Sequence, residues 1–137
     1  MKNFRLGLTL MLVCSSLLFI RCTPEQIMAS STKEIIQQGT WSVGYYFDGQ
    51  DRTADYHGYE FTFNSSGAVS CTDGTNTYSG TWSTHKDSGS NEMLTMNIQN
   101  APASINSLDT DWTIGSVALN SIGMKNASST QLVLKKL

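Results

Sequence analysis

The sequence predicts an all-β domain of about eight short antiparallel strands. After Gly39, apolar and polar residues alternate with a period of two in most segments, which is typical of strands with one buried face. Turn-forming residues separate these segments at intervals of roughly ten residues, as in a barrel or a sandwich. Almost no helical pattern is available for crossover connections. We therefore expect each strand to pair with its neighbours in chain order.

The one helical pattern covers residues 31–38 and leads into the first strand. Thr32 is a candidate N-cap, Ile35 and Ile36 are expected to dock the helix, and Gly39 is expected to end it. In the first strand, Tyr45 is expected to point inward and Tyr46 outward. The apolar positions expected to face the core, strand by strand, are Trp41, Val43 and Tyr45; Tyr59, Phe61 and Phe63; Val69 and Cys71; Tyr78, Gly80 and Trp82; Leu94, Met96 and Ile98; Trp112 and Ile114; Val117 and Leu119, continued by Ile122 and Met124; and Leu132 and Leu134.

The connections carry their own signals. Residues 64–67 (Asn-Ser-Ser-Gly) and 72–75 (Thr-Asp-Gly-Thr) are typical of tight hairpins. Residues 85–91 form a polar loop, and residues 101–108 form a longer connection in which we expect a helical turn. The first connection, residues 48–56, is polar and is flanked by aromatic residues.

The chain begins with a leader of the secretory type. Lys2 and Arg5 give it a positive start, and the uncharged run of residues 6–20 is shorter than the roughly 20 apolar residues of a spanning helix. Cys22 at its end suggests a bacterial lipoprotein, cut before Cys22 and lipidated there with acyl chains such as palmitate. The residues at the cleavage edge, 19–21 (Phe-Ile-Arg), depart from the usual pattern. A plain secretory signal cut after Ala29 and an uncleaved anchor therefore stay open as alternatives.

This interpretation divides the chain into three parts: a signal peptide (1–21), a tether (22–31) and one barrel domain (32–137). The domain's length of about 105 residues allows a single core. The expected location is the cell envelope, as an outer membrane lipoprotein facing the periplasm or the cell surface.

After removal of the leader only Cys71 remains beside the lipidated Cys22, so no internal disulfide is expected. We interpret Cys71 as a small buried apolar residue.

Charge excludes one class of partner. Without Lys2, Arg5 and Arg21, six basic residues face 11 acidic ones, which gives a net charge of −5. An acidic chain without a basic cluster does not favour nucleic acid. Its net charge also predicts no attraction to anionic lipid headgroups, so membrane attachment is expected through Cys22.

The order of several short motifs resembles a known family. Residues 39–48 (Gly-Thr-Trp-Ser-Val-Gly-Tyr-Tyr-Phe-Asp) contain a Gly-x-Trp element, and further similarity lies at residues 59–64, 80–82, 111–114 and 132–136. The chain is similar in this respect to the lipocalin-like domain of bacterial envelope lipoproteins. The resemblance implies an eight-stranded antiparallel up-and-down barrel, with Gly39 and Trp41 as its signature. It implies little chemistry, and the chain is shorter than true lipocalins.

Trp41 has a physical role to fill in such a barrel. A large side chain with one donor can close a barrel end while its N–H binds a carbonyl group. Trp82 and Trp112 also fall on apolar faces, where the same role is expected.

Catalytic and metal-binding patterns are weak in the sequence. His57 and His85 belong to no metal-ligand spacing, and the acidic residues of the first connection lack the spacing of an EF-hand. We expect no enzyme activity, no cofactor and no metal. The tentative ligand-binding residues are the aromatic ones near the barrel's open end and one tryptophan: Tyr45, Phe47, Tyr56 and Trp82.

Two functions follow from this sequence. The first is a binding module for a small apolar or amphipathic ligand, and the second is a filled barrel that contacts another envelope protein. The internal volume separates them, because a cavity of about 300 Å³ or more would favour a ligand. A filled interior would favour the protein partner.

Overall fold

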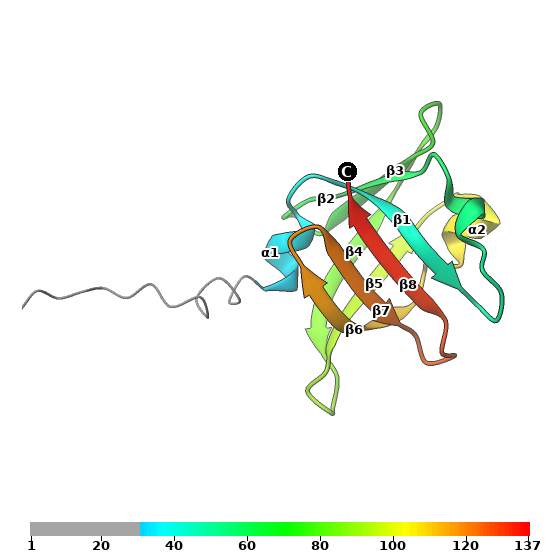
Figure 1. Ribbon diagram of the computed structural model, residues 1–137. Helices are drawn as coiled ribbons and strands as arrows, with labels where there is room; N and C mark the ends of the chain where they lie inside the picture. Colours follow the sequence, from blue (N-terminus) through cyan, green and yellow to red (C-terminus); the bar gives the residue numbers. More distant parts are fainter. Residues whose placement is uncertain (1–30) are drawn as a thin grey trace, which may run out of the picture.

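The computed structural model describes residues 31–137, which form a closed barrel of eight antiparallel strands in chain order (Figure 1). The strand β8 pairs with β1 and closes the barrel. This confirms the expected all-β, eight-stranded, up-and-down architecture with a short helix before the first strand. The expected signal peptide, Cys22 and the expected tether up to residue 30 lie outside the described residues. The strands are β1 (Thr40–Phe47), β2 (Glu60–Phe63), β3 (Ala68–Thr72), β4 (Thr77–Lys86), β5 (Glu92–Ile98), β6 (Asp111–Ala118), β7 (Ser121–Lys125) and β8 (Gln131–Lys136).

The connections alternate between two ends of the barrel. The α1 end carries the helix α1 (Thr32–Ile36), the β2–β3, β4–β5 and β6–β7 turns, and the end of β8. The α2 end carries the 3₁₀ helix η2 (Thr53–Tyr56), the helix α2 (Ala103–Asn106), and the β3–β4 and β7–β8 turns. Figure 1 shows α1 and α2 on opposite sides of the barrel.

The N-cap of helix α1 is Ser31, one residue before the expected Thr32. The Ser31 hydroxyl accepts the Glu34 N–H at 3.3 Å, and the Glu34 carboxylate accepts the Ser31 N–H at 3.2 Å, which is a capping box. Thr32, the expected N-cap, is buried instead, and its hydroxyl donates to the Glu92 carboxylate at 2.8 Å. The expectation for Thr32 was therefore wrong. After the helix, Gly39 turns the chain into β1 with a φ of +90°, in the region that favours glycine.

A β-bulge in β1 reverses the expected orientation of two tyrosines. The register with β8 shifts between Val43 and Tyr45, so that Gly44 is the extra residue. Tyr46 is consequently buried inside the barrel, whereas Tyr45 and Phe47 lie on the outer face and are half-buried. The prediction that Tyr45 points inward and Tyr46 outward was wrong, because period-two counting fails across a bulge.

A second bulge lies in β6, between Ile114 and Ser116. Beyond it Val117 reaches the rim of the barrel at the α1 end, and Leu119 lies past the strand in the turn to β7. Their exposed fractions are 38% and 63%. The expectation that these two residues continue a buried alternation was therefore wrong.

Side chains fill the interior. All three tryptophans are buried, and each indole N–H donates to a backbone carbonyl of a connection: Trp41 to Ile36 (2.8 Å), Trp82 to Asn64 (2.9 Å) and Trp112 to Leu108 (2.9 Å). Aliphatic and sulfur-containing side chains occupy the space between the two ends. The largest fully buried side chains of the whole core, aromatic ones included, are Trp41, Trp112, Phe61, Phe63, Ile36, Leu94, Met96, Ile98, Ile105, Leu108, Ile122 and Leu132.

We predict that the Trp41 indole contributes to stability both through its volume and through its hydrogen bond. Trp41→Ala should lower the free energy of unfolding by about 3–5 kcal/mol, because it leaves a large cavity. Trp41→Phe keeps much of the volume but leaves the Ile36 carbonyl without its donor, at a cost of about 1–3 kcal/mol. Urea denaturation of both variants measures the two contributions. An alanine variant as stable as the parent chain would contradict the role of Trp41.

Candidate functional site

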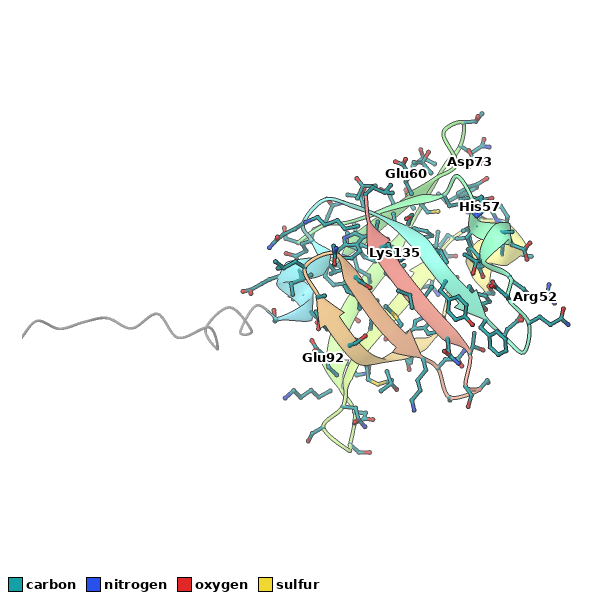
Figure 2. All side chains as sticks on the ribbon, in the orientation of Figure 1. Arg52, His57, Glu60, Asp73, Glu92 and Lys135 are labelled. Atoms are coloured by element: carbon teal, nitrogen blue, oxygen red, sulfur yellow. The ribbon has the colours of Figure 1, made fainter. Side chains whose placement is uncertain are left out.

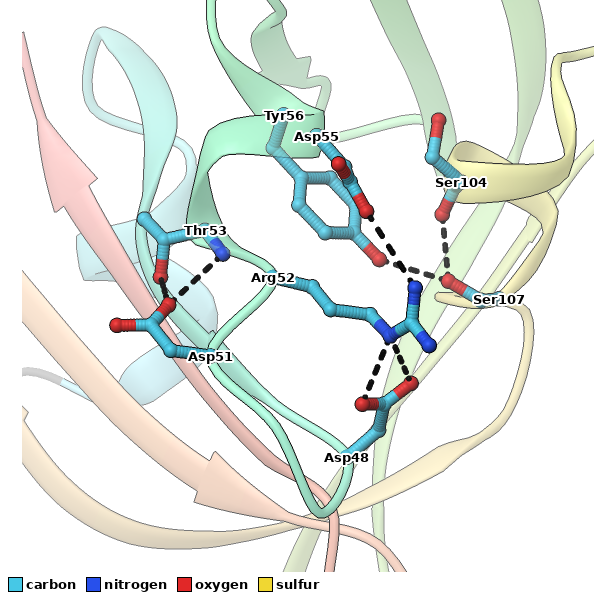
Figure 3. Close-up of polar contacts among 8 residues, drawn as sticks. All are labelled: Asp48, Asp51, Arg52, Thr53, Asp55, Tyr56, Ser104 and Ser107. Atoms are coloured by element: carbon cyan, nitrogen blue, oxygen red, sulfur yellow. Dashed lines mark hydrogen bonds and ion pairs between the residues drawn. The ribbon is translucent and has the colours of Figure 1, made fainter.

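The α2 end carries a depression of about 290 Å³ that opens to solvent. Arg52 spans it, because its Nε lies 3.0 Å from the Asp48 carboxylate and its guanidinium lies 3.9 Å from the Asp55 carboxylate (Figure 3). Beside it, the Tyr56 and Ser107 hydroxyls are 2.7 Å apart, and the Ser107 hydroxyl donates to the Ser104 carbonyl. The polar groups of this depression thus bind one another.

These groups have little capacity for chemistry. Burial raises the pKa of the Tyr56 hydroxyl, so this group stays neutral and acts only as a hydrogen-bonding partner. The Arg52 charge is balanced by two neighbouring carboxylates, and as an exposed ion-pair cluster it adds little stability. Across residues 31–137, no group of three or more His, Cys, Asp or Glu side chains is arranged to hold a metal ion.

The four residues expected to bind a ligand do not meet at one site. Tyr56 is buried at the α2 end, where its ring packs on Tyr46 with centroids 4.8 Å apart. Trp82 is buried near the α1 end, against Phe63, at a centroid distance of 5.5 Å. Tyr45 and Phe47 lie together on the outside of β1, with their rings stacked at 6.4 Å and nearly parallel. Of the four, only Tyr45 and Phe47 are not buried, although Tyr56 and Trp82 each line a hollow that opens to solvent.

Their neighbours extend this area across the outer wall. Tyr45 lies opposite Val133 in β8, Val133 lies opposite Gly123 in β7, and Gly123 lies opposite Ser116 in β6. A hollow of about 300 Å³ opens to solvent here, with Gly115, Gly123 and Val133 in its lining, and the Ser116 hydroxyl lies close beside Gly123. We call the outward-facing residues Tyr45, Phe47, Gly123 and Val133 the aromatic wall.

The sequence holds part of the signal for this surface. Val133 lies between two residues expected to be buried, Leu132 and Leu134, so its outward position follows from alternation. The outward position of Tyr45 depends on the bulge at Gly44, and the hollow at Gly123 depends on the pairing of three strands. A glycine inside a strand pattern, as at position 44, is a local sign of a bulge, whereas the pairing of the three strands has no local signal.

The remaining candidate residues lie apart from both surfaces. His57 and His85 are exposed and line neither hollow: His57 follows η2 at the α2 end, where Figure 2 labels it close to Asp73, and His85 belongs to β4 on the α1 side. Cys71 is fully buried in β3 and forms no disulfide. Among the described residues, no helix is long and apolar enough to cross a bilayer.

Comparisons with known proteins extend the description of the fold. No protein-family model and no curated protein matches the chain. Among solved structures, the barrel is similar to the crystal structure of a DUF4847 family protein from Bacteroides vulgatus, with a TM-score of 0.56 and 18% identity, over 77% of this chain and 96% of that one. It is also similar to the NMR structure of a protein from Burkholderia xenovorans, with a TM-score of 0.50 and 16% identity, over 77% of this chain and 86% of that one. At these identities the similarity shows the fold alone.

We predict that the Cys71 thiol is unreactive in the folded protein and gives the chain an alkaline sensitivity. Burial, with a smaller effect of the Asp73 charge, raises the thiol pKa from 9.0 to about 12. Above about pH 9 the thiol ionises in the unfolded chain and stays neutral in the folded one. Ionisation then favours the unfolded chain, so the free energy of unfolding falls as the pH rises from 9 towards 12. Melting temperatures between pH 8 and 11 should therefore fall less steeply for Cys71→Ala than for the parent chain. Equal slopes would contradict the prediction.

Proposed function

We propose that the chain is a lipid-anchored envelope lipoprotein without enzymatic activity, whose filled barrel binds another envelope protein through its outer wall. The observation that carries this proposal is the packed interior. An internal ligand needs an enclosed volume, but the space between Trp41 and Trp112 is occupied by side chains. Four hollows of about 200 to 300 Å³ on the described part of the chain all open to solvent.

The aromatic wall supports a protein partner more than a small ligand. Tyrosine and phenylalanine rings give large contact areas at low cost in conformational entropy, and they are enriched at protein interfaces. The hollow at Gly123 is shallow and open, so it would take a protruding side chain of a partner. The Arg52 depression offers less, since its charged and hydroxyl groups are already paired with one another.

Attachment through Cys22 and the lipocalin-like relationship are further parts of this proposal. Their support is the leader pattern and the order of motifs around Gly39 and Trp41. The fold is compatible with a tether, because Ser31, the first described residue, lies at the α1 end of the barrel and the eight described strands pair with one another.

We expect Cys22→Ser to move the chain from the membrane fraction to the soluble envelope fraction, because the variant has no thiol to lipidate. Immunoblotting of the separated fractions measures the distribution. Cys14→Ser, which changes a cysteine of the leader, serves as the matched control and should leave the distribution unchanged. A Cys22→Ser chain that stays membrane-bound and keeps its leader would instead favour the uncleaved anchor.

We expect the aromatic wall to contact a specific envelope protein in cells. A photo-crosslinking amino acid at Val133 should give a discrete adduct, whereas the same group at Thr81, an exposed position on the outer face of β4, should not. Gly123→Lys fills the hollow and should remove the adduct, while Thr81→Lys should leave it. Thermal unfolding of both lysine variants controls for loss of the fold.

Two results would contradict the interface. Adducts of equal yield at Val133 and Thr81 would mean that the wall has no specific partner. An adduct only with a second copy of the chain would make the wall a self-association surface.

A further inference from the structure

The most exposed apolar side chains of the described domain gather at one end of the barrel. Val117, Leu119 and Leu137 are the most exposed large apolar residues of the described chain, with exposed fractions of 38%, 63% and 68%. Val117 and Leu119 belong to the end of β6 and its turn, and Leu137 follows β8. The Lys136 N–H donates to the Asn120 carbonyl at 3.0 Å, so the turn and the end of β8 are in direct contact. All three residues therefore lie at the α1 end.

Charge is divided unequally between the same two ends. The α1 end has four basic and three acidic side chains, a net charge of +1, whereas the α2 end has two basic and seven acidic ones, a net charge of −5. In Figure 2, Arg52 and Asp73 of the α2 end lie far from Glu92 of the α1 end. The groups at the α1 end are Lys33, Glu34, Lys86, Asp87, Glu92, Lys135 and Lys136. Those at the α2 end are Asp48, Asp51, Arg52, Asp55, Glu60, Asp73, Asp109, Asp111 and Lys125.

The position of Ser31 relates these features to the proposed anchor. The nine residue steps from Cys22 to Ser31 reach at most about 30 Å when fully extended. The eight residues of β1 alone span about 26 Å, which is close to the length of the barrel. A tether of about 30 Å would therefore need almost its full length to pass from the α1 end to the α2 end. A lipid at Cys22 therefore holds the α1 end, and not the α2 end, near the bilayer.

We infer that the α1 end of the barrel rests on the phospholipid surface into which the Cys22 lipid is inserted, with Leu119 and Leu137 in contact with the interface. This inference rests on the proposed lipidation of Cys22. Leucine side chains partition into the interface, and lysines at the same end can bind lipid phosphates. The acidic α2 end is repelled by anionic headgroups and points away. The net charge of the whole chain predicts no attraction to anionic lipid. The unequal division of charge between the α1 and α2 ends nevertheless orients the barrel on the surface.

Cysteine accessibility in native membranes tests this orientation. The full chain, expressed with its own leader, would carry Leu119→Cys at the α1 end or Thr75→Cys at the α2 end. The lipid occupies Cys22, and burial protects Cys71, so the introduced thiol is the reactive one. Labelling by a polar maleimide should be about tenfold slower at position 119 in membranes than after solubilisation in detergent. At position 75 the two rates should agree.

Ser66→Cys adds a polar, exposed position at the α1 end, and it should show intermediate protection. This variant distinguishes protection of the whole end from an effect of replacing a leucine. It also leaves the apolar contacts of Leu119 and Leu137 in place, so it tests the same orientation with the proposed surface intact.

The outcomes separate the orientation from the anchor. A membrane-bound chain whose cysteines at 119 and 75 react equally fast would overturn the orientation and leave lipid attachment standing. Protection at position 119 that persists in detergent would assign the surface to a protein or a second copy, which also overturns it. A chain that is recovered in the soluble fraction, as Cys22→Ser is expected to be, would overturn both proposals together.

Discussion

Three indole N–H groups bind the barrel to the segments that close its ends, and the packed interior depends on them. Trp41 binds the last turn of α1, Trp82 binds the β2–β3 turn, and Trp112 binds the chain after α2. Each buried indole N–H needs an acceptor. The carbonyl that it binds lies in a connection and is not used in the hydrogen bonds between strands. A single contact therefore satisfies both partners and fixes the position of the connection over the core. Because the three tryptophans enter from both ends, side chains occupy the space that the strands enclose.

The sequence predicted the fold well because the fold depends on local patterns. Alternation located the strands, the 64–67 and 72–75 signals located two hairpins, and the scarcity of helix excluded crossovers. The predictions failed where one inserted residue changes the face. Period-two counting carries no term for the bulges at Gly44 in β1 and after Ile114 in β6, although a glycine inside a strand pattern, as at positions 44 and 115, is a local sign of a bulge. Ser31 and Thr32 both suit an N-cap by residue type, so the residue type alone does not distinguish the true cap, Ser31, from the expected one.

The candidate surfaces were harder to predict, because they depend on pairing between distant strands. Aromatic residues beside a polar loop suggested one mouth with Tyr45, Phe47 and Tyr56. The bulge divides this group: Tyr46 joins Tyr56 in the core, whereas Tyr45 and Phe47 join Val133 on the outside. The hollow at Gly123 is lined by residues of three strands, among them Val133 of β8 and Ser116 of β6, so it depends on how these strands pair. The gathering of Leu119 and Leu137 likewise needs the register of three strands.

The pairing of β1 with β8 has a consequence for how the barrel is made. These strands form the first and last parts of the domain, and residues such as Ser42 and Lys135 meet only after nearly the whole domain has emerged. Until then, β1 presents an open edge of unpaired backbone groups, which is a template for pairing with other chains. Contacts of such long range also form slowly. The interval between the appearance of β1 and that of β8 is thus the period in which this domain is most exposed to aggregation, and the pairing of β8 with β1 ends it.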